Sequence, residues 1–580
     1  MTLTYHGYDP LNRTKFVGYN TVVNGGVTSY ESSTSYEYDA GNRMTQIVDS
    51  AGGTITEVYD NLDRLTSETT AQGSITYGYD NANRSTSVQV AGQPQLTYSY
   101  DNADRLIQIA QGASSVGFSY DNVNRRTSLT MPNGVSASYD YDGDSRVTDI
   151  TYQFGTNTLG NLTYSYDQLG RRTQLGGSFA RTSLPGAITT AAYDAANELT
   201  EWNGTEISYD ANGSMLSDGS NVFTWNARNQ MATLNGVALQ YDALDRRIKN
   251  ATGNSFLFDG ANAIQELSGS TVMANIWSGG LDELFQRSDS NGIVVPLRDG
   301  LGSTIALVDP NGNIQTTYSY DPFGNTTTSG AASMNPSQFT GRENEGNGLY
   351  FARARYYSPV LGRFVSEDPL GFRGGDANLY AYVGDDPTNE TDNVGLERKW
   401  YNLGQGYRAG RDRFDEGAGT QFEIHVYKGD KELGIVKGDL GWIGKHGEAA
   451  ARPAGIPDEV LATINGINVN EMRANGSLGP KGTKDITGAL DGAGRGYLRP
   501  GRMLGVLNVI SIITGEMAAA ADEKRLLAGR KNLTDVDKKR IVCEHARIPE
   551  RPDYVDTTLG PMPDHAVGCA RWQANGDDWM

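Results

Sequence analysis

Short runs of alternating hydrophobic and polar residues recur along the first 250 residues, each followed by a cluster of turn residues. Residues 74–79 read Ser-Ile-Thr-Tyr-Gly-Tyr, an alternation rich in Tyr, Thr and Ile that is typical of a β-strand with one buried face. Residues 80–84, Asp-Asn-Ala-Asn-Arg, favour a turn, because Asp and Asn side chains hydrogen-bond their own backbone. The pattern therefore predicts β-hairpins.

These hairpins form a repeat: in its first six turns a Tyr-Asp pair, preceded in most of them by Tyr-Xaa, is followed by an arginine four residues after the aspartate. The first six turns in the series are 20 or 21 residues apart and the last four are 16 apart. The residues that begin these turns are Asp39, Asp60, Asp80, Asp101, Asp121 and Asp142, then Asp194, Asp210, Asn226 and Asp242. A fixed period of this size predicts a repeat architecture whose hairpins need their neighbours for stability. We assign the Tyr, Asp and Arg residues a structural role.

Composition changes abruptly after residue 396. Residues 1–396 contain 23 Lys and Arg against 43 Asp and Glu, whereas residues 397–580 contain 26 of each. Eleven of the thirteen lysines, four of the five histidines and both cysteines follow the change. A chain of 580 residues is too long for one core, so we predict two modules. The acidic first module is a poor candidate for binding nucleic acid or an anionic membrane.

Several motifs before the change resemble the RHS-repeat-associated core of RHS/YD-repeat polymorphic toxins. They occupy residues 298–303 (Arg-Asp-Gly-Leu-Gly-Ser), 318–325 (Tyr-Ser-Tyr-Asp-Pro-Phe-Gly-Asn), 339–342 (Phe-Thr-Gly-Arg), 350–372 and 392–396 (Asp-Asn-Val-Gly-Leu). The resemblance implies a mostly β protein: a cocoon-like shell of YD-repeat hairpins over residues 1–254, a core that plugs it over 255–396, and a small α+β effector over 397–580. The shell is short for the family, so we expect either a closed cocoon or an incomplete one.

Two aspartates, Asp368 and Asp392, mark Asp-Xaa-Xaa-Gly corners on either side of the last core motif. Two carboxylates held close together share a proton, so one can activate water while the other protonates a leaving amide. The resemblance implies that this pair acts as an aspartic-type autoprotease that cuts after Leu396. Asn393 departs from the family, which usually has a proline there, and the alternative is that both aspartates only cap turns. Arg363 either pairs with one carboxylate or lies on the surface without a role.

The last 184 residues offer a set of acid–base groups. Residues 422–427 and 434–436 predict a hairpin that carries His425, and Lys445, His446 and Glu448 follow shortly after it. This set suits acid–base attack on a phosphodiester, or binding of one divalent metal ion. The alternative is a group of ordinary polar residues around a hairpin. Helical patterns are expected only in this module, at residues 458–466, 501–529 and 535–543.

Two further features of this module have competing interpretations. Cys543, His545, His565 and Cys569 could form a tetrahedral zinc site, but a disulfide or two unrelated thiols fits the spacing at least as well. Residues 503–521 are almost wholly apolar and approach the length of a membrane span. We favour a buried effector helix over a pore, because a glutamate within the run, Glu516, is costly in lipid.

The predicted function is a self-cleaving shell that encapsulates a C-terminal toxin and delivers it in interbacterial competition, the toxin being an intracellular enzyme such as a nuclease. The alternatives are a pore-forming effector and a teneurin-like structural or adhesive protein. We expect the shell to need no cofactor and to hold its own cleaved fragment. The expected partners are an immunity protein, secretion machinery or an upstream shell segment, and a nucleic-acid target. The first residues lack a classical signal peptide, so we expect another delivery route into the target cytoplasm.

Overall fold

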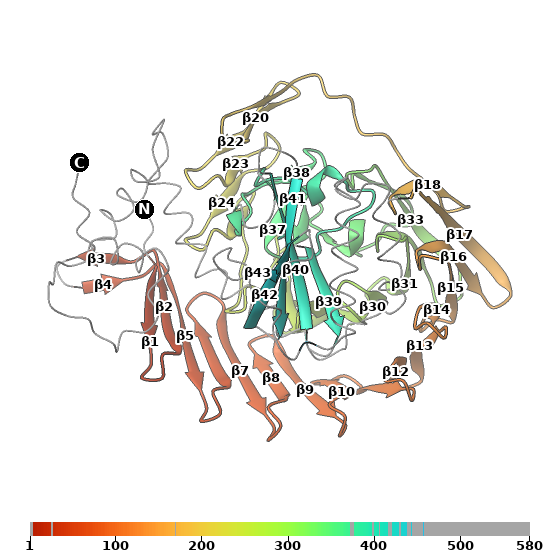
Figure 1. Cartoon of the computed structure of the whole chain (residues 1–580), viewed down its shortest axis with the longest axis horizontal. Helices are drawn as coiled ribbons and strands as arrows, with labels where there is room; N and C mark the ends of the chain where they lie inside the picture. The colour runs from red at the N-terminus through yellow and green to blue at the C-terminus, as the bar shows by residue number, and fades with distance from the viewer. Residues whose placement is uncertain are drawn as a thin grey trace.

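The computed structural model describes residues 4–396, except 25–26, 169, 372–375 and 377, and beyond them the strands between residues 399 and 443 and Ile456. This part of the chain is almost entirely antiparallel β-structure (Figure 1). The helical segments whose bounds the structure gives are the 3-10 turns η1 (Phe339–Gly341) and η3 (Val383–Asp385). The mostly β prediction is confirmed; the helices expected after residue 457 lie outside the described residues.

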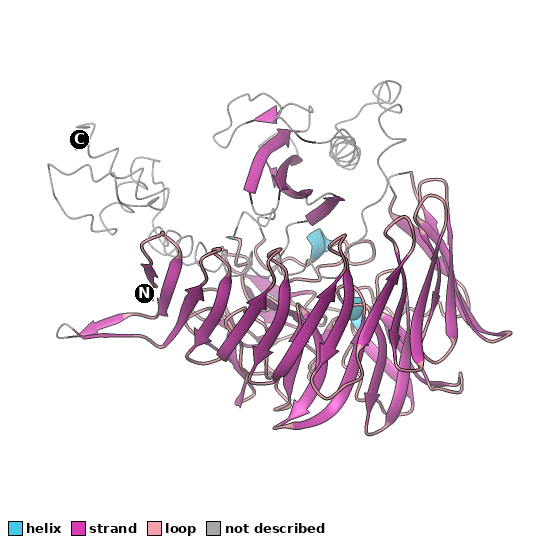
Figure 2. Ribbon diagram, turned by 90° about the horizontal axis from the view of Figure 1, so that it is seen from below, coloured by secondary structure: helices cyan, strands magenta, loops and turns pink. Residues whose placement is uncertain are grey.

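One 16-stranded sheet forms the outer wall, and each strand pairs with the next strand along the chain. Between β2 and β5, the small hairpin β3 (Val22–Asn24) and β4 (Val27–Ser29) forms a separate two-stranded sheet. The strands curve side by side from the red to the orange part of the chain in Figure 1, and Figure 2 shows the same row of strands in magenta. They are β1 (Tyr5–Tyr8), β2 (Thr14–Tyr19), β5 (Ser32–Tyr38), β6 (Met44–Asp49), β7 (Gly53–Tyr59), β8 (Leu65–Thr70), β9 (Gly73–Tyr79), β10 (Ser85–Val90), β11 (Leu96–Tyr100), β12 (Leu106–Gln111), β13 (Ser114–Tyr120), β14 (Arg126–Thr130), β15 (Val135–Tyr141), β16 (Val147–Phe154), β17 (Asn157–Tyr166) and β18 (Arg172–Gly176).

The turn between β5 and β6 shows why each repeat carries Asp and Arg. Asp39 Oδ1 accepts hydrogen bonds from the backbone N–H groups of Gly41 (2.8 Å) and Arg43 (3.0 Å), and Arg43 Nε donates to Asp39 Oδ2 at 2.7 Å. Asn42 adopts a positive φ of 64°, a conformation that Asn and Asp tolerate better than most residues. The aspartate thus fixes the turn and the direction of the arginine at once.

The same arginine links its hairpin to the next one. Arg43 Nη1 donates to the carbonyl oxygen of Asp60 at 2.7 Å, and its guanidinium lies 5.3 Å from the centre of the Tyr59 ring. A tyrosine completes the link between the later hairpins, where the hydroxyl of Tyr79 donates to the carbonyl of Leu65 at 2.8 Å. Since these contacts recur along the wall, the YD repeat is a set of contacts between neighbouring hairpins.

The remaining strands form smaller sheets along the rest of the described chain. They are β19 (Ala191–Tyr193), β20 (Leu199–Trp202) and β21 (Thr205–Glu206); β22 (Ser208–Tyr209) and β23 (Met215–Ser217); β24 (Phe223–Trp225), β25 (Met231–Leu234) and β26 (Val237–Ala238); the eight-stranded sheet β27 (Ser255–Asp259), β28 (Asn262–Ser268), β29 (Thr271–Ser278), β30 (Leu284–Asp289), β31 (Gly292–Arg298), β32 (Thr304–Val308), β33 (Ile314–Tyr320) and β34 (Thr326–Gly330); β35 (Glu343–Asn344), β36 (Tyr350–Ala352), β37 (Arg355–Ser358) and β38 (Arg363–Phe364); and β39 (Lys399–Gly404), β40 (Tyr407–Asp415), β41 (Thr420–Lys428), β42 (Lys431–Lys437) and β43 (Trp442–Ile443). The pairing of β41 with β42 confirms the hairpin predicted over residues 422–436.

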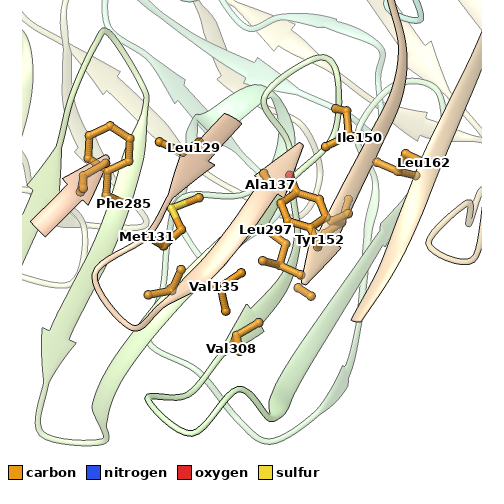
Figure 3. Packing of buried hydrophobic residues seen from close by; sticks show 14 of the residues in the cluster. Leu129, Met131, Val135, Ala137, Ile150, Tyr152, Leu162, Phe285, Leu297 and Val308 are labelled. Carbon is orange, nitrogen blue, oxygen red and sulfur yellow. The ribbon is translucent and has the colours of Figure 1, made fainter. Parts of the chain in front are cut away.

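A shared hydrophobic core joins the outer wall to the eight-stranded sheet. The wall contributes buried residues such as Val135 and Tyr152, and the eight-stranded sheet contributes Phe285, Leu297 and Val308. Figure 3 shows these side chains converging between the two sets of strands. The alternation seen in the sequence therefore directs one face of the wall toward the inner chain.

Buried charges also face inward from the wall. Glu68 pairs with Arg246 at 2.8 Å, and Asp49 pairs with Arg228 at 2.6 Å. Burial raises the pKa of the neighbouring Glu57 to about 7, against the lowering effect of the hydrogen bond from the Tyr59 hydroxyl. The folded protein thus retains a proton on Glu57 at a pH where the unfolded chain has lost it.

Acidification should therefore stabilise the shell through Glu57. Between pH 4.5 and 7 the folded state binds the Glu57 proton more tightly than the unfolded state does. The contribution of this proton to the free energy of unfolding is therefore present at low pH and is lost as pH rises through about 7, by up to about 1.4 kcal/mol per pH unit. Glu57→Gln should make the unfolding free energy, measured in urea, less dependent on pH across this range. Glu37→Gln, an exposed residue of β5, is the matched control, and equal slopes in all three proteins would contradict the expectation.

Candidate functional site

The first predicted aspartate, Asp368, lies at a buried turn shortly after β38. Its backbone N–H donates to the carbonyl of Leu379 at 2.7 Å, which ties this turn to a later segment of the inner chain. Its Oδ1 accepts from the N–H of Leu370 at 2.7 Å, and its carbonyl accepts from the N–H of Gly371 at 2.8 Å. The Asp-Xaa-Xaa-Gly motif therefore forms the predicted corner.

The second aspartate, Asp392, organises the last described turn before residue 397. Its Oδ1 accepts from the backbone N–H groups of Val394 (3.3 Å), Gly395 (2.9 Å) and Leu396 (3.2 Å). Leu396 is buried and packs near Leu370. The carboxylate therefore lies beside the residue after which cleavage is expected, and it caps the turn as well.

Arg355 brings the two aspartates together. Its Nη2 lies 2.9 Å from Asp368 Oδ2 and 3.6 Å from Asp392 Oδ2. The Arg355 side chain is fully buried, and the two carboxylates are almost so. Two acids that are 24 residues apart in sequence thus contact one guanidinium group, which balances part of their charge.

Further contacts fix the position of this guanidinium. Arg355 Nε donates to the carbonyl of Gly395 at 2.5 Å, and Nη1 donates to the carbonyl of Leu379 at 3.0 Å. Its guanidinium carbon lies 3.6 Å from the centre of the Phe364 ring. The arginine is therefore held by both turns and by an aromatic face.

The pKa of Asp392 is shifted by its surroundings. Burial raises this pKa, the positive charge of Arg355 lowers it, and the charge of Asp368 raises it again, so that the result lies above the ordinary range. The structure thus favours retention of a proton by Asp392, and of the two aspartates Asp368 has the shorter contact with the arginine.

The turn at residues 392–396 leaves no room for change at Gly395. Its φ is +70°, and a Cβ atom there would lie 2.3 Å from the carbonyl oxygen of Ala352, far below a permitted contact. Two residues before Gly395, the carbonyl of Asn393 accepts hydrogen bonds from Arg342 at 3.4 Å and from Arg353. The corner therefore forms with asparagine where the family usually has proline.

The structure corrects the expectation for Arg363. This arginine is buried, and it donates to the carbonyl of Asn197 at 2.9 Å and to Oδ1 of Asn378 at 3.3 Å. It stacks between tyrosine rings, so it neither pairs with the aspartates nor lies on the surface. The counter-charge, Arg355, was missed by the sequence analysis. Its signal was an arginine in the aromatic run of residues 350–357, where a buried cation requires an acidic partner.

The effector candidates lie largely outside the described residues. His425 is on β41, opposite Gly410 of β40 and Ile435 of β42; its side chain is outside the description. Lys445, His446, Glu448 and the zinc candidates Cys543, His545, His565 and Cys569 lie wholly outside it. Within the described ranges, no group of three or more His, Cys, Asp or Glu side chains could hold a metal ion. In the same part of the chain, no helix has the length and hydropathy needed to span a membrane.

Comparison with known proteins identifies the family of the repeat shell. The chain matches the family described as Teneurin YD-shell over residues 79–175 and 135–387, and the RHS Repeat family over residues 59–95. It is 28% identical over 270 residues to the tRNA3(Ser)-specific nuclease WapA of Bacillus spizizenii, a match that covers 43% of this chain and 11% of that protein. It is 37% identical over 99 residues to the toxin protein Tse5 of Pseudomonas aeruginosa, covering 17% of this chain and 7% of that protein.

Among solved structures, the crystal structure of TcdB2-TccC3 without its hypervariable C-terminal region aligns with a TM-score of 0.48 and 15% identity, covering 68% of this chain and 28% of that one. This chain spans about a tenth of the length of the curated relatives. The stacked YD hairpins and the buried inner segment define a β-shell protein. Because the matches to the Teneurin YD-shell description span more than half of the 580 residues, the chain belongs to the teneurin YD-shell family.

Removing the shared counter-charge should strongly destabilise the inner chain. Arg355→Gln leaves two buried carboxylates without their cation, which typically costs about 3–5 kcal/mol. The change also raises the pKa of Asp392 further, so the loss should be smallest at low pH and should grow as pH rises through the folded-state pKa of Asp392. Chemical denaturation at several pH values measures it.

Arg171→Gln is the control for this measurement. Its side chain is 61% exposed and pairs with Asp167 in the outer wall, a type of pair that contributes about 1 kcal/mol or less. A similar, pH-independent loss of unfolding free energy in Arg355→Gln and Arg171→Gln would show that Arg355 does not neutralise the aspartates.

Proposed function

We propose that this protein is a self-cleaving YD-repeat shell that carries a C-terminal toxin and delivers it in interbacterial competition. The observation that carries the proposal is the contact of Asp368 and Asp392 with the single guanidinium of Arg355, beside Leu396. Neither a turn cap nor an adhesive shell requires two acids to share one buried cation. The toxins among the relatives support the same function.

The different distances of the two acids from Arg355, together with the raised pKa of Asp392, suggest their roles in cleavage after Leu396. Asp368, held 2.9 Å from Arg355, is the base that accepts a proton from the attacking water. Asp392, whose pKa is raised by burial, is the acid that gives a proton to the leaving amide nitrogen. Arg355 keeps both carboxylates in place and stabilises the negative charge that develops during attack.

The purified protein should consist of two fragments of about 43 and about 20 kDa, from their lengths of 396 and 184 residues. Asp392→Asn and Asp368→Asn should each leave a single full-length band, because an amide cannot transfer the proton. Denaturing gels and intact-mass measurement of the new C-terminus test this expectation.

Asp385→Asn is the control for this test, because Asp385 is an exposed aspartate of η3 at a positive φ that asparagine also adopts. It should cleave as the wild type does. A wild-type chain that stays intact after complete folding would refute the self-cleavage proposal.

For the fragment after residue 396, we propose an intracellular enzyme, and among enzymes a nuclease. Its histidines and lysines supply acid–base groups and cations for phosphate at neutral net charge, and one relative is a tRNA-specific nuclease. His425, His446 and Glu448 are the proposed acid–base set, with Lys445 at the phosphate. Zinc or another divalent metal on the Cys543–Cys569 group remains a further proposal. An immunity protein and delivery machinery are the proposed partners.

Expression of residues 397–580 alone in a bacterial cytoplasm tests this assignment. His425→Ala and His446→Ala should each relieve growth arrest at least tenfold in viable counts while the soluble yield is unchanged, and RNA and DNA should stay intact in the variants. If both variants remain toxic while Glu516→Ala abolishes membrane depolarisation and toxicity, the effector is a pore. A fragment without toxicity would favour a structural, teneurin-like role.

A further inference from the structure

A four-residue turn, Gly280–Glu283, connects β29 to β30 and touches three parts of the molecule. We call it the junction turn. It closes with a hydrogen bond from the N–H of Glu283 to the carbonyl of Gly280 at 3.1 Å. Asp282 has a φ of +63°, a conformation that a residue other than glycine keeps when its surroundings fix it in place. The contacts of Asp282 and Glu283 identify those surroundings.

Asp282 binds the inner chain that carries the cleavage site. Its Oδ1 and Oδ2 lie 2.6 and 3.1 Å from the two terminal nitrogens of Arg353, and Oδ1 also pairs with Arg342. These same two arginines donate to the carbonyl of Asn393, the residue after Asp392. We call the turn at residues 392–396 the cleavage turn. The carboxylate of Asp282, in the eight-stranded sheet, therefore binds the two arginines whose side chains hydrogen-bond to this turn.

The next residue binds the outer wall. Both carboxylate oxygens of Glu283 contact the guanidinium of Arg126, the first residue of β14, and one of these contacts measures 3.4 Å. Arg126 itself touches no residue of the cleavage turn among the contacts of the described chain. The junction turn thus connects the 16-stranded wall, through side-chain contacts, to the arginines that donate hydrogen bonds to the carbonyl of Asn393.

Close packing makes this link specific. Arg298 donates to the carbonyl of Asp282, and a Cβ atom on Gly341 would lie 3.0 Å from that carbonyl and 2.8 Å from Arg298 Nη2. Burial lowers the pKa values of Arg298, Arg342 and Arg353, the last to about 10. Three desolvated guanidinium groups therefore depend on Asp282, which the inner chain meets only when the β29–β30 hairpin is docked.

We propose that the junction turn makes self-cleavage conditional on closure of the shell, so that the chain is cut only after the outer wall and the eight-stranded sheet have packed on the inner chain. The inference rests on the proposed self-cleavage. Before docking, Arg342 and Arg353 lack the carboxylate that brings them together, and the turn at Asn393 is not held against Arg355. Asp282 and Glu283 are positioning residues that act through the arginines.

The test follows cleavage of the full-length chain in time after cell-free synthesis, by denaturing gel, and follows folding in parallel by resistance to a protease. The wild-type chain should become protease-resistant before it is cut. Asp282→Asn, which keeps the size of the side chain but removes its charge, should slow cleavage at least tenfold. The cleavage rate of this variant should depend on pH with the same midpoint as that of the wild-type chain, because Asp368 and Asp392 are unchanged.

Arg126→Gln extends the test to the outer wall. It should slow cleavage at least threefold although Arg126 is remote from the cleavage turn, and Arg126→Lys should restore most of the rate by keeping the charge. Arg171→Gln, which removes an exposed, aspartate-paired arginine at the β17–β18 turn of the same sheet, should cleave at the wild-type rate.

The outcomes separate this inference from the proposed function. Cleavage of Asp282→Asn and Arg126→Gln at the wild-type rate would overturn the inference while leaving self-cleavage intact. Slowing that merely equals the fall in the protease-resistant fraction would also overturn it, because the effect would then be one of folding alone. A wild-type chain that never cleaves would overturn the proposed function, and the inference with it.

Discussion

The contact on which the shell depends is the one between an arginine and the next hairpin along the chain. A two-stranded hairpin is only marginally stable alone, and each strand edge exposes unpaired backbone groups. In this wall the arginine that completes one turn donates to the carbonyl of the following turn and lies over its tyrosine, as Arg43 does with Asp60 and Tyr59. Each such contact contributes little to stability because it is partly exposed, but its repetition aligns the hairpins in one curved sheet.

That curved sheet has an inner face which is not purely apolar. Ion pairs such as Asp49–Arg228 and Glu68–Arg246 are almost completely buried, so they are costly unless the partners meet correctly. Hydrophobic contact between the wall and the inner chain tolerates some sliding, whereas a buried charge does not. The inner ion pairs therefore specify how the chain of residues 199–396 seats inside the wall, which in turn sets the position of the two aspartates.

Much of this could be predicted from the sequence because it is local. The strand alternation, the 20- to 21-residue period and the Asp-to-Arg spacing describe turns and neighbouring strands, and the structure has them where they were expected. Asp368 and Asp392, chosen through motif resemblance, both contact Arg355, while their role in cleavage stays a prediction. Arg355 and Arg363 could not be told apart, because both stand in aromatic runs near the pair and only the long-range path of β37 and β38 decides which one meets the acids. Asp282 was beyond prediction for the same reason, since 71 residues separate it from Arg353.

Arginine–carboxylate pairs thus serve two purposes that differ only in burial. On the rim of the wall, where Asp39 and Arg43 are about a quarter exposed, water screens the pair and the acid stays ionised, so the contact is purely structural. Inside the shell, the fully buried Arg355 contacts two acids. Burial of these three charged groups costs folding free energy, and the same burial raises the pKa of Asp392. The proposed self-cleavage requires an acid that gives a proton to the leaving group, and a raised pKa suits Asp392 to that role. Burial inside the shell therefore distinguishes this pair from the partly exposed pairs of the wall, because it brings two acids to one arginine and raises the pKa of one of them.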